Sequence, residues 1–176
     1  PVLCRVIHTT ADFSYRDTLT ITDGAIEKAK EEIRRGLPII TDTTMAASGI
    51  NKTAAGKFGI EVHCFIGDED VKAKAKESGM TRSAVSVEKA AGCYPECIYA
   101  VGNAPTALMR LYELIEEKKI RPALIIGVPV GFVNVVEAKE LILRTDVPAI
   151  VARGRKGGSN IAAAICNALM YEAGGR

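Results

Sequence analysis

The sequence predicts an α/β fold, a three-layer α/β/α sandwich built around a mainly parallel sheet of about five strands. The first observation behind this prediction is that short apolar runs alternate with helical patterns along the 176 residues, the βα order typical of such folds. The second is that these runs are continuously apolar and rich in β-branched residues, which indicates strands buried on both faces. A chain of this length is expected to form one domain.

The strand predictions follow from these apolar runs. We expect strands over residues 37–41, 60–66, 97–101, 123–126 and 149–152. The segment 13–21 is ambiguous: Phe13, Tyr15, Leu19 and Ile21 alternate as in a strand, but a short helix or an excursion fits nearly as well.

The helix predictions rest on apolar residues spaced three and four apart and on capping residues. Asp23 is expected to cap the first helix, and Thr81 the helix that ends near Gly92. Asp68 places negative charge at the start of a helix that ends at Gly79, where the helix dipole favours it. The predicted helices cover residues 23–36, 68–79, 81–92, 104–115, 133–143 and 160–172.

Composition excludes several functional classes. The net charge is +2 with 25% charged residues, no Trp and 5% aromatics, so neither a polybasic nucleic-acid surface nor a base-stacking platform is expected. The most apolar stretch, residues 123–133, is interrupted by Gly127, Pro129 and Gly131, and no run is long enough to span a bilayer. No signal peptide is visible.

The cysteines indicate a reducing compartment. There are 5, an odd number, and reduced thiols in the cytoplasm are the simplest interpretation. Cys93 and Cys97 are separated by three residues, which is not a usual zinc or redox spacing. We therefore expect burial as small hydrophobic side chains and no metal site.

Loops at the ends of the predicted strands locate the functional site. Four apolar runs end in polar or glycine-bearing segments that open a helix, namely 41–44, 102–106, 127–131 and 153–159. Ligands of open parallel sheets bind outside the carboxyl ends of the strands. The sequence therefore predicts a site along one edge of the sheet.

The last of these loops favours an anion. Arg153, Arg155 and Lys156 precede the paired glycines Gly157 and Gly158, and the next residues open a helix at Ser159 and Asn160. A helix N-terminus offers unpaired N–H groups and a positive partial charge, which suit phosphate or carboxylate. The segment matches neither common nucleotide-binding glycine motif. A solvated basic turn that caps a structural helix fits the local pattern about as well.

Three other loop segments are candidate contacts. Thr81, Arg82 and Ser83 place a guanidinium between two hydroxyls at a helix start. Arginine binds carboxylates in a bidentate manner, although a surface salt bridge is the ordinary role of a single Arg. Asn103 is a natural N-cap ahead of Pro105, and this role can be purely structural.

In the segment Pro129, Val130 and Gly131, the proline restricts the backbone and the glycine has no side chain, so a ligand can approach the backbone closely. It can form an apolar wall against a large flat ligand, or simply a tight turn.

Only two histidines are present. His63 lies inside an apolar run, and we expect it in the core or behind the site. His8 ends an apolar segment and precedes polar residues. Imidazole exchanges protons near neutral pH, so His8 is a candidate catalyst, with Asp12 and Asp42 as possible partners.

Several segments together resemble the precorrin-8X methylmutase family, and the resemblance runs in order through nearly the whole chain. They are Arg-Val-Ile-His at 5–8, Gly-Met-Thr-Arg-Ser-Ala at 79–84, Gly-Asn-Ala-Pro-Thr-Ala-Leu at 102–108, Gly-Val-Pro-Val-Gly-Phe-Val at 127–133 with Glu137, and Arg-Gly-Arg-Lys-Gly-Gly-Ser at 153–159.

The resemblance implies a flavodoxin-like fold, a homodimer and a place in cobalamin biosynthesis. It also implies a reaction without a cofactor, in which a methyl group migrates from carbon 11 to carbon 12 of a corrin precursor, either precorrin-8X or cobalt-precorrin-8. The family histidine corresponds to His8, which would protonate a ring nitrogen and recover the proton. Residues 1–176 are then a single domain of this family that lacks part of its N-terminal segment.

Such a substrate, a wide apolar ring edged with carboxylates, suits the predicted loops. We expect it to contact Thr81, Arg82, Ser83, Asn103, Pro129, Val130, Gly131, Arg153, Arg155, Gly157, Gly158 and Ser159. Two other functions remain open: a tetrapyrrole carrier without catalysis, and a nucleotide-binding module of flavodoxin-like architecture. The missing nucleotide motifs disfavour the second.

Overall fold

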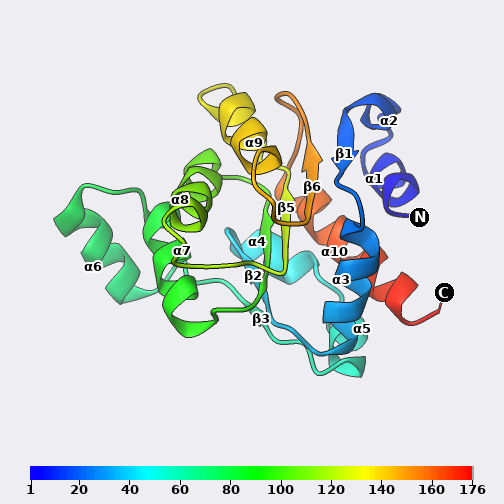
Figure 1. The fold of residues 1–176 in the computed structure, drawn as a ribbon, viewed down its shortest axis with the longest axis horizontal. Helices are drawn as coiled ribbons and strands as arrows, with labels where there is room; N and C mark the ends of the chain where they lie inside the picture. Colours follow the sequence, from blue (N-terminus) through cyan, green and yellow to red (C-terminus); the bar gives the residue numbers. More distant parts are fainter. Residues whose placement is uncertain (176) are drawn as a thin grey trace.

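A six-stranded sheet forms the centre of the computed structural model, which describes residues 1–175 (Figure 1). The strand order is β1-β6-β5-β4-β2-β3; β1 pairs antiparallel with β6, and all other pairs are parallel. The strands are β1 Leu19–Ile21, β2 Ile39–Thr41, β3 Val62–His63, β4 Ile98–Val101, β5 Leu124–Gly127 and β6 Ala149–Ala152.

Helices cover both faces of the sheet, as the continuous apolar runs predicted. Along β4, Ile98 and Ala100 pack into the core on one face, and Tyr99 and Val101 into the core on the other. The first core is covered by α1 Val2–Thr10, α3 Ala25–Arg34, α4 Thr44–Gly49, α5 Lys52–Lys57 and α10 Ser159–Ala173. The second is covered by α7 Arg82–Cys93, α8 Pro105–Glu116 and α9 Val135–Leu143, with α6 Glu69–Ser78 packed outside α7.

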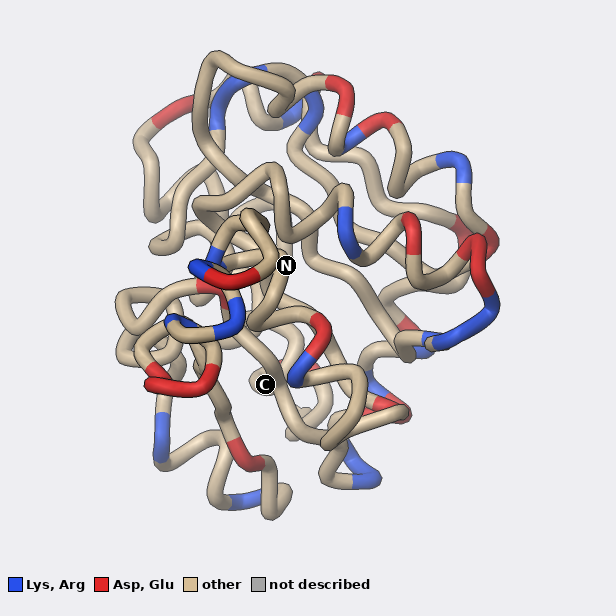
Figure 2. Tube along the Cα trace, turned by 90° about the vertical axis from the view of Figure 1, so that its left-hand side faces the viewer, with Lys and Arg blue, Asp and Glu red and all other residues tan. Residues whose placement is uncertain are grey.

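Charged residues are spread over the outside of these layers. Figure 2 shows acidic and basic positions interspersed along the helices, without a large block of one sign. In the part of the chain that the structure describes, we find no helix of the length and apolarity needed to cross a bilayer.

The sixth strand comes from the ambiguous segment 13–21. Both interpretations of it are partly right: its middle forms the short helix α2 Tyr15–Thr18, and its end forms β1. Leu19 pairs with Ala152 and Ile21 with Ile150, so β1 is an antiparallel edge strand. The prediction of about five strands missed it because three residues carry too little pattern to identify a strand. The predicted strand 60–66 is shorter in the structure, where β3 covers Val62–His63 at the other edge of the sheet.

The predicted helices are all present, but some caps and short helices differ. Thr81 caps α7, where its Oγ1 accepts from the N–H of Ala84 at 3.2 Å. Asp23 does not cap α3, whose N-cap is Gly24 with φ of 72°. The described chain begins with helix α1, whose Val2 and Val6 are buried in the core that α1 shares with α10. Helices α2, α4 and α5 have too few residues to show a helical period.

Asp42 joins the loops after β2 and β4. Its buried carboxylate accepts hydrogen bonds from the backbone N–H groups of Gly102, Asn103 and Ala104 at 2.9, 2.8 and 2.8 Å. Burial raises the pKa of the Asp42 carboxyl, and the three N–H donors oppose that shift. These N–H groups precede α8, whose N-cap is Ala104. A neighbouring loop therefore caps this helix, and the prediction that Asn103 is its N-cap is wrong.

Glycines allow the loops to pack without space between them. A Cβ on Gly102 would lie 2.6 Å from Cα of Ser159, and one on Gly157 would lie 2.6 Å from the carbonyl oxygen of Pro129. The N–H of Gly158 donates to the carbonyl of Val128 at 2.8 Å. The loops after β4, β5 and β6 therefore pack directly on one another.

Replacing Gly157 by Ala should destabilise the protein by about 1–3 kcal/mol, the usual cost of forcing atoms into a packed site. The added methyl meets backbone atoms of Val128 and Pro129, which cannot rotate away. Thermal unfolding measures the effect. Gly56→Ala is the matched control: it lies in α5 with nothing within 4 Å of the new Cβ, so its stability should be equal or higher. Equal melting temperatures for both variants would contradict the packing argument.

Asp42→Asn should lower the free energy of unfolding by about 1–3 kcal/mol, because the amide group leaves a buried N–H without an acceptor. For a domain of this size, each kcal/mol lowers Tm by roughly 2–4 °C. Asp17→Asn, at an exposed aspartate of α2, is the control. A wild-type Tm in Asp42→Asn would show that the three hydrogen bonds do not stabilise the loops.

Candidate functional site

The predicted loops meet along the carboxyl edge of the parallel strands. Thr43 Oγ1 and Ser159 Oγ share a hydrogen bond of 2.8 Å, which joins the loop after β2 to the start of α10. Thr81 Oγ1 donates to Thr106 Oγ1 at 3.0 Å, which places the start of α7 beside the first turn of α8. Together with Asp42 and the glycine contacts, these bonds make one continuous edge from α7 to α10.

The loop after β6, residues 153–158, is here called the basic loop. It stands at the top of Figure 1, between α9 and α2. Arg153 forms a bidentate pair with Glu140, with Nε and Nη2 at 2.8 and 2.7 Å from its oxygens. Lys156 Nζ donates to Asp12 at 2.6 Å and to Ser14 at 2.9 Å. Two of the three predicted cations thus bind neighbouring side chains, as the alternative of a structural basic turn predicts.

Asp12 is the acidic partner of the basic loop. Its hydrogen bond with Lys156, aided by Ser14, lowers the pKa of the Asp12 carboxyl to about 2. This pair ties the segment that follows α1 to the carboxyl edge.

Two cations at this edge carry no ion pair or side-chain hydrogen bond within residues 1–175. They are Arg155 in the basic loop and Arg82 in the first turn of α7, both exposed. Arg82 forms no salt bridge with any other residue of the described part of the chain, although a surface salt bridge was the alternative to a ligand contact. Ser83 beside it is partly buried, and the side chain of Asn103 is exposed although its N–H binds Asp42.

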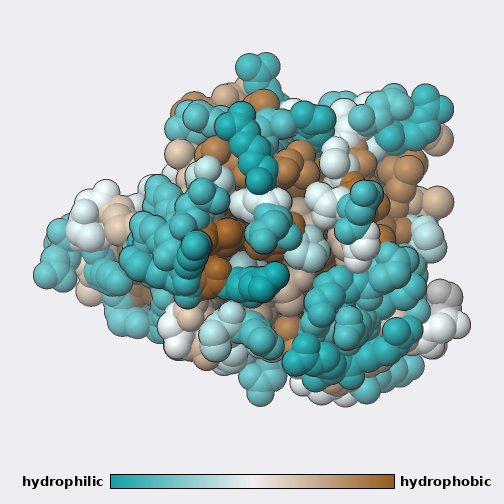
Figure 3. Space-filling model, viewed as in Figure 1, coloured by the Kyte–Doolittle hydropathy of each residue, from teal (hydrophilic) through white to brown (hydrophobic). Residues whose placement is uncertain are grey.

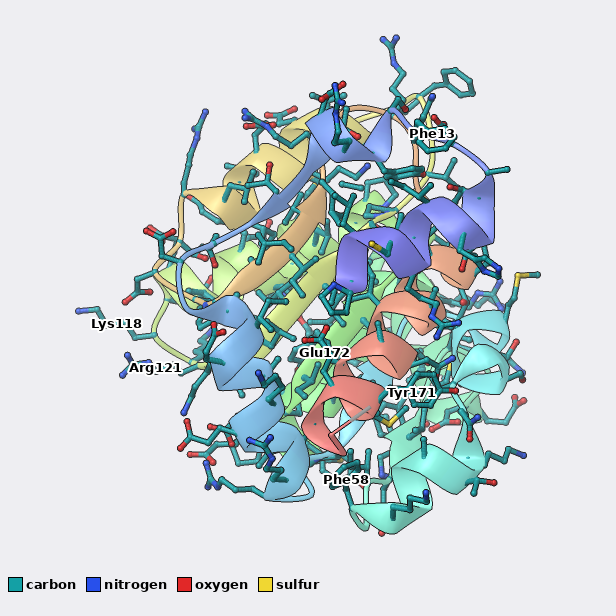
Figure 4. The ribbon with its side chains drawn as sticks, turned by 90° about the vertical axis from the view of Figure 1, so that its right-hand side faces the viewer. Phe13, Phe58, Lys118, Arg121, Tyr171 and Glu172 are labelled. Atoms are coloured by element: carbon teal, nitrogen blue, oxygen red, sulfur yellow. The ribbon has the colours of Figure 1, made fainter. Side chains whose placement is uncertain are left out.

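Apolar side chains are exposed on both sides of the basic loop. Gly131 donates its N–H to the carbonyl of Arg155 at 3.2 Å, and it is followed by Phe132, 86% exposed, and Val133, 77% exposed. On the other side, Phe13 is 79% exposed, between the two residues that bind Lys156; Figure 4 shows it projecting from the molecule.

Exposed aromatic side chains at a loop edge indicate a contact surface. Figure 3 shows apolar side chains in the upper half of the molecule, over α9 and β6, and a hydrophilic surface over α3. Phe13 and Phe132 are not among the contacts predicted from the sequence. The available signal was their rarity, since the chain has only 4 Phe.

Several predicted contacts lie inside the loop packing. Pro129 is buried, as are Gly158 and Ser159, while Gly157 is partly buried against the loop after β5. Val130, 46% exposed, and partly buried Gly131 are the members of the predicted apolar wall that reach the surface. The buried residues Pro129, Gly158 and Ser159 pack the loops together and do not form the outer surface of the carboxyl edge.

His8 lies in the last turn of α1 and is exposed. It lines a shallow depression with Pro1, Cys4 and Arg5. Its proposed partners are engaged elsewhere, because Asp12 binds Lys156 and Asp42 binds the start of α8. Of the two possible partners named for His8, both carboxylates therefore bind other groups. Helix α1 ends at Thr10, and Asp12, which follows it, binds Lys156 of the basic loop, so His8 precedes the segment that contacts this loop.

The remaining residues considered in the sequence are His63, Cys93 and Cys97. His63 is not in the core: its side chain is 25% exposed, binds Glu61 through Nε2 at 2.9 Å and stacks on Tyr94. Cys97 is buried as expected, but Cys93 is exposed, which corrects that prediction. Over residues 1–175, no group of three or more His, Cys, Asp or Glu side chains is arranged to hold a metal ion.

Comparison with known proteins agrees with this architecture. The cobalt-precorrin-8 methylmutase of Salmonella typhimurium is 46% identical over 171 residues, covering 97% of this chain and 80% of that protein. The cobalt-precorrin-8 methylmutase of Leptospira interrogans is 44% identical, covering 96% of this chain and 80% of that protein.

A solved structure gives the same result in three dimensions. The crystal structure of precorrin-8X methylmutase from Thermus thermophilus superposes with a TM-score of 0.91 at 40% identity, covering 99% of this chain and 85% of that one. The family model described as precorrin-8X methylmutase matches residues 1–172. The family match over residues 1–172, the identity to these relatives and the shared fold show that this chain belongs to the precorrin-8X methylmutase family.

Proposed function

We propose that this protein is an isomerase that moves a methyl group from carbon 11 to carbon 12 of precorrin-8X or cobalt-precorrin-8, giving hydrogenobyrinate or cobyrinate. The observation that carries the proposal is the match of the precorrin-8X methylmutase family model over residues 1–172. We propose that no cofactor takes part, as the resemblance to the family implies.

The carboxyl edge supports this proposal through its mixture of charge and apolar surface. The substrate is a wide, flat ring with carboxylates around its periphery. Arg82 and Arg155 are exposed cations that can bind carboxylates, and the exposed Phe13, Phe132 and Val133 offer apolar area for the ring. We propose this surface as the substrate site, with Arg153 and Lys156 supporting the basic loop through their acidic partners.

His8 is the proposed acid and base. A proton delivered to a ring nitrogen beside the migration site withdraws electrons from the conjugated system and favours the shift. The same imidazole then recovers the proton. General acid–base catalysis of this kind contributes about 10²–10⁴-fold, and orientation of the ring with exclusion of water supplies the remainder.

The proposed active form is a homodimer in the cytoplasm. The apolar side chains Phe13, Phe132 and Val133 extend beyond what a monomer buries, and exposed apolar surface of this kind marks ligand or protein contacts. A second copy that covers this edge would exclude water from the ring.

The direct test is to incubate the protein with precorrin-8X and separately with its cobalt complex, and to follow the visible spectrum. Conversion to the corrin product supports the isomerase and identifies the preferred substrate. Tight product binding without conversion of either substrate would instead identify a tetrapyrrole carrier.

His8→Ala should reduce turnover by about 10²–10⁴-fold, the contribution of general acid–base catalysis. The affinity for hydrogenobyrinate, measured by absorption titration, should remain close to that of the wild type. The stability should not change, since His8 is exposed. His63→Ala, which removes the only other histidine, is the matched control and should retain turnover. Near-normal turnover of His8→Ala would exclude His8 as the proton donor.

Arg82→Ala should weaken product binding by about tenfold or more, since a hydrogen bond to a charged group contributes about 1.5–3 kcal/mol. Arg121→Ala is the matched control. This exposed arginine precedes β5, so it lies at the amino ends of the parallel strands, opposite the carboxyl edge. Figure 4 shows it far from Phe13. Equal affinity in both variants would remove Arg82 from the site.

A further inference from the structure

Lys139 is a fully buried lysine beside the basic loop. It lies on α9, and its side chain is 0% exposed. Its Nζ donates to the carbonyl oxygens of Gly154 and Lys156, both at 2.8 Å. A buried amino group is unusual unless its hydrogen bonds are satisfied, and here two of them end on the basic loop.

The bonds of Lys139 complete a set of backbone contacts along that loop. The carbonyl of Arg155, between the two that Lys139 binds, accepts from the N–H of Gly131 at 3.2 Å. Three successive carbonyls of the basic loop therefore bind α9 or the loop that precedes it. Glu140, the next residue of α9, binds the side chain of Arg153. The side chain of Arg155 stays exposed at the centre of these contacts.

These bonds do not require a charge on Lys139. Burial lowers the pKa of its ammonium to about 8, and within residues 1–175 no carboxylate pairs with it, since the nearby Glu140 binds Arg153 and Asp12 binds Lys156. The neutral amine has two N–H groups, enough for both carbonyls. Lys139 can therefore form both hydrogen bonds whether its amine is protonated or neutral.

We propose that Lys139 is a positioning residue for the substrate: it holds the backbone of residues 154–156 so that Arg155 faces the substrate carboxylates. This inference rests on the proposed function. A role in stability alone explains the residue poorly, because an apolar side chain of similar length usually stabilises a buried position as well as a buried charge does. What an apolar side chain cannot supply is two donors for the loop carbonyls.

The test compares Lys139→Met with the wild type and with Lys76→Met, the same change at an exposed position of α6. Three quantities are measured: Tm, the affinity for hydrogenobyrinate, and the rate of trypsin cleavage after Arg153 and Arg155. We expect Lys139→Met to keep a Tm near that of the wild type, to bind product about tenfold more weakly and to be cleaved faster in the basic loop. KM should rise more than kcat falls, and Lys76→Met should match the wild type.

A rescue experiment covers the case in which Lys139→Met folds poorly. Lys139→Ala leaves space for propylammonium, which has the missing atoms and donors, whereas 1-propanol has a single donor. Recovery of product affinity with propylammonium but not with 1-propanol supports the proposal.

Two results would overturn the proposal: wild-type affinity and trypsin resistance in Lys139→Met, or equal rescue by both additives. Failure of the proposed function is a separate outcome, because the wild type would then not convert the corrinoids, while the trypsin comparison would still report on the loop.

Discussion

The buried carboxylate of Asp42 is the contact on which the rest of the carboxyl edge depends. It comes from the loop after β2 and accepts three N–H groups at the start of α8, which follows β4. A helix N-terminus favours an anion, and in this protein a side chain from the neighbouring loop supplies it. With this helix start occupied, Gly102 can pack against Ser159, and the loops after β4, β5 and β6 follow in contact with one another.

This packing decides which charged side chains at the carboxyl edge hold the loops and which can bind a ligand. Three cations in the basic loop first suggest three ligand contacts, but Arg153 and Lys156 bind Glu140 and Asp12. Their charges hold the loop between α9 and the segment after α1. Arg155 is the cation of this loop left for a ligand, and it stands between exposed aromatic side chains. A surface of this kind suits a ligand that is apolar across its face and anionic at its border.

Local sequence patterns predicted the features that depend on residues close together in the sequence. Thr81 was recognisable as a cap because its acceptor and the N–H it binds are three residues apart. The helices α3, α6, α7, α8, α9 and α10 were recognisable because a helix long enough to bury one face shows a repeated spacing. Asn103 was misassigned as a cap, since the true acceptor is 62 positions from Ala104. The strand β1 stayed ambiguous because its three residues carry little pattern and its pairing partner, β6, lies far along the chain.

The sequence by itself determined the α/β class, the edge of the sheet where the glycine-bearing and basic loops gather, and the family, because these depend on periodicity and on short motifs within continuous segments. Only the tertiary structure decided which residues at that edge are free to meet a ligand. That outcome depends on pairs such as Lys156 with Asp12 and Lys139 with Gly154, whose members are distant or unremarkable in the sequence. A charged side chain is available to a ligand only if the folded protein does not already use it to hold its own loops.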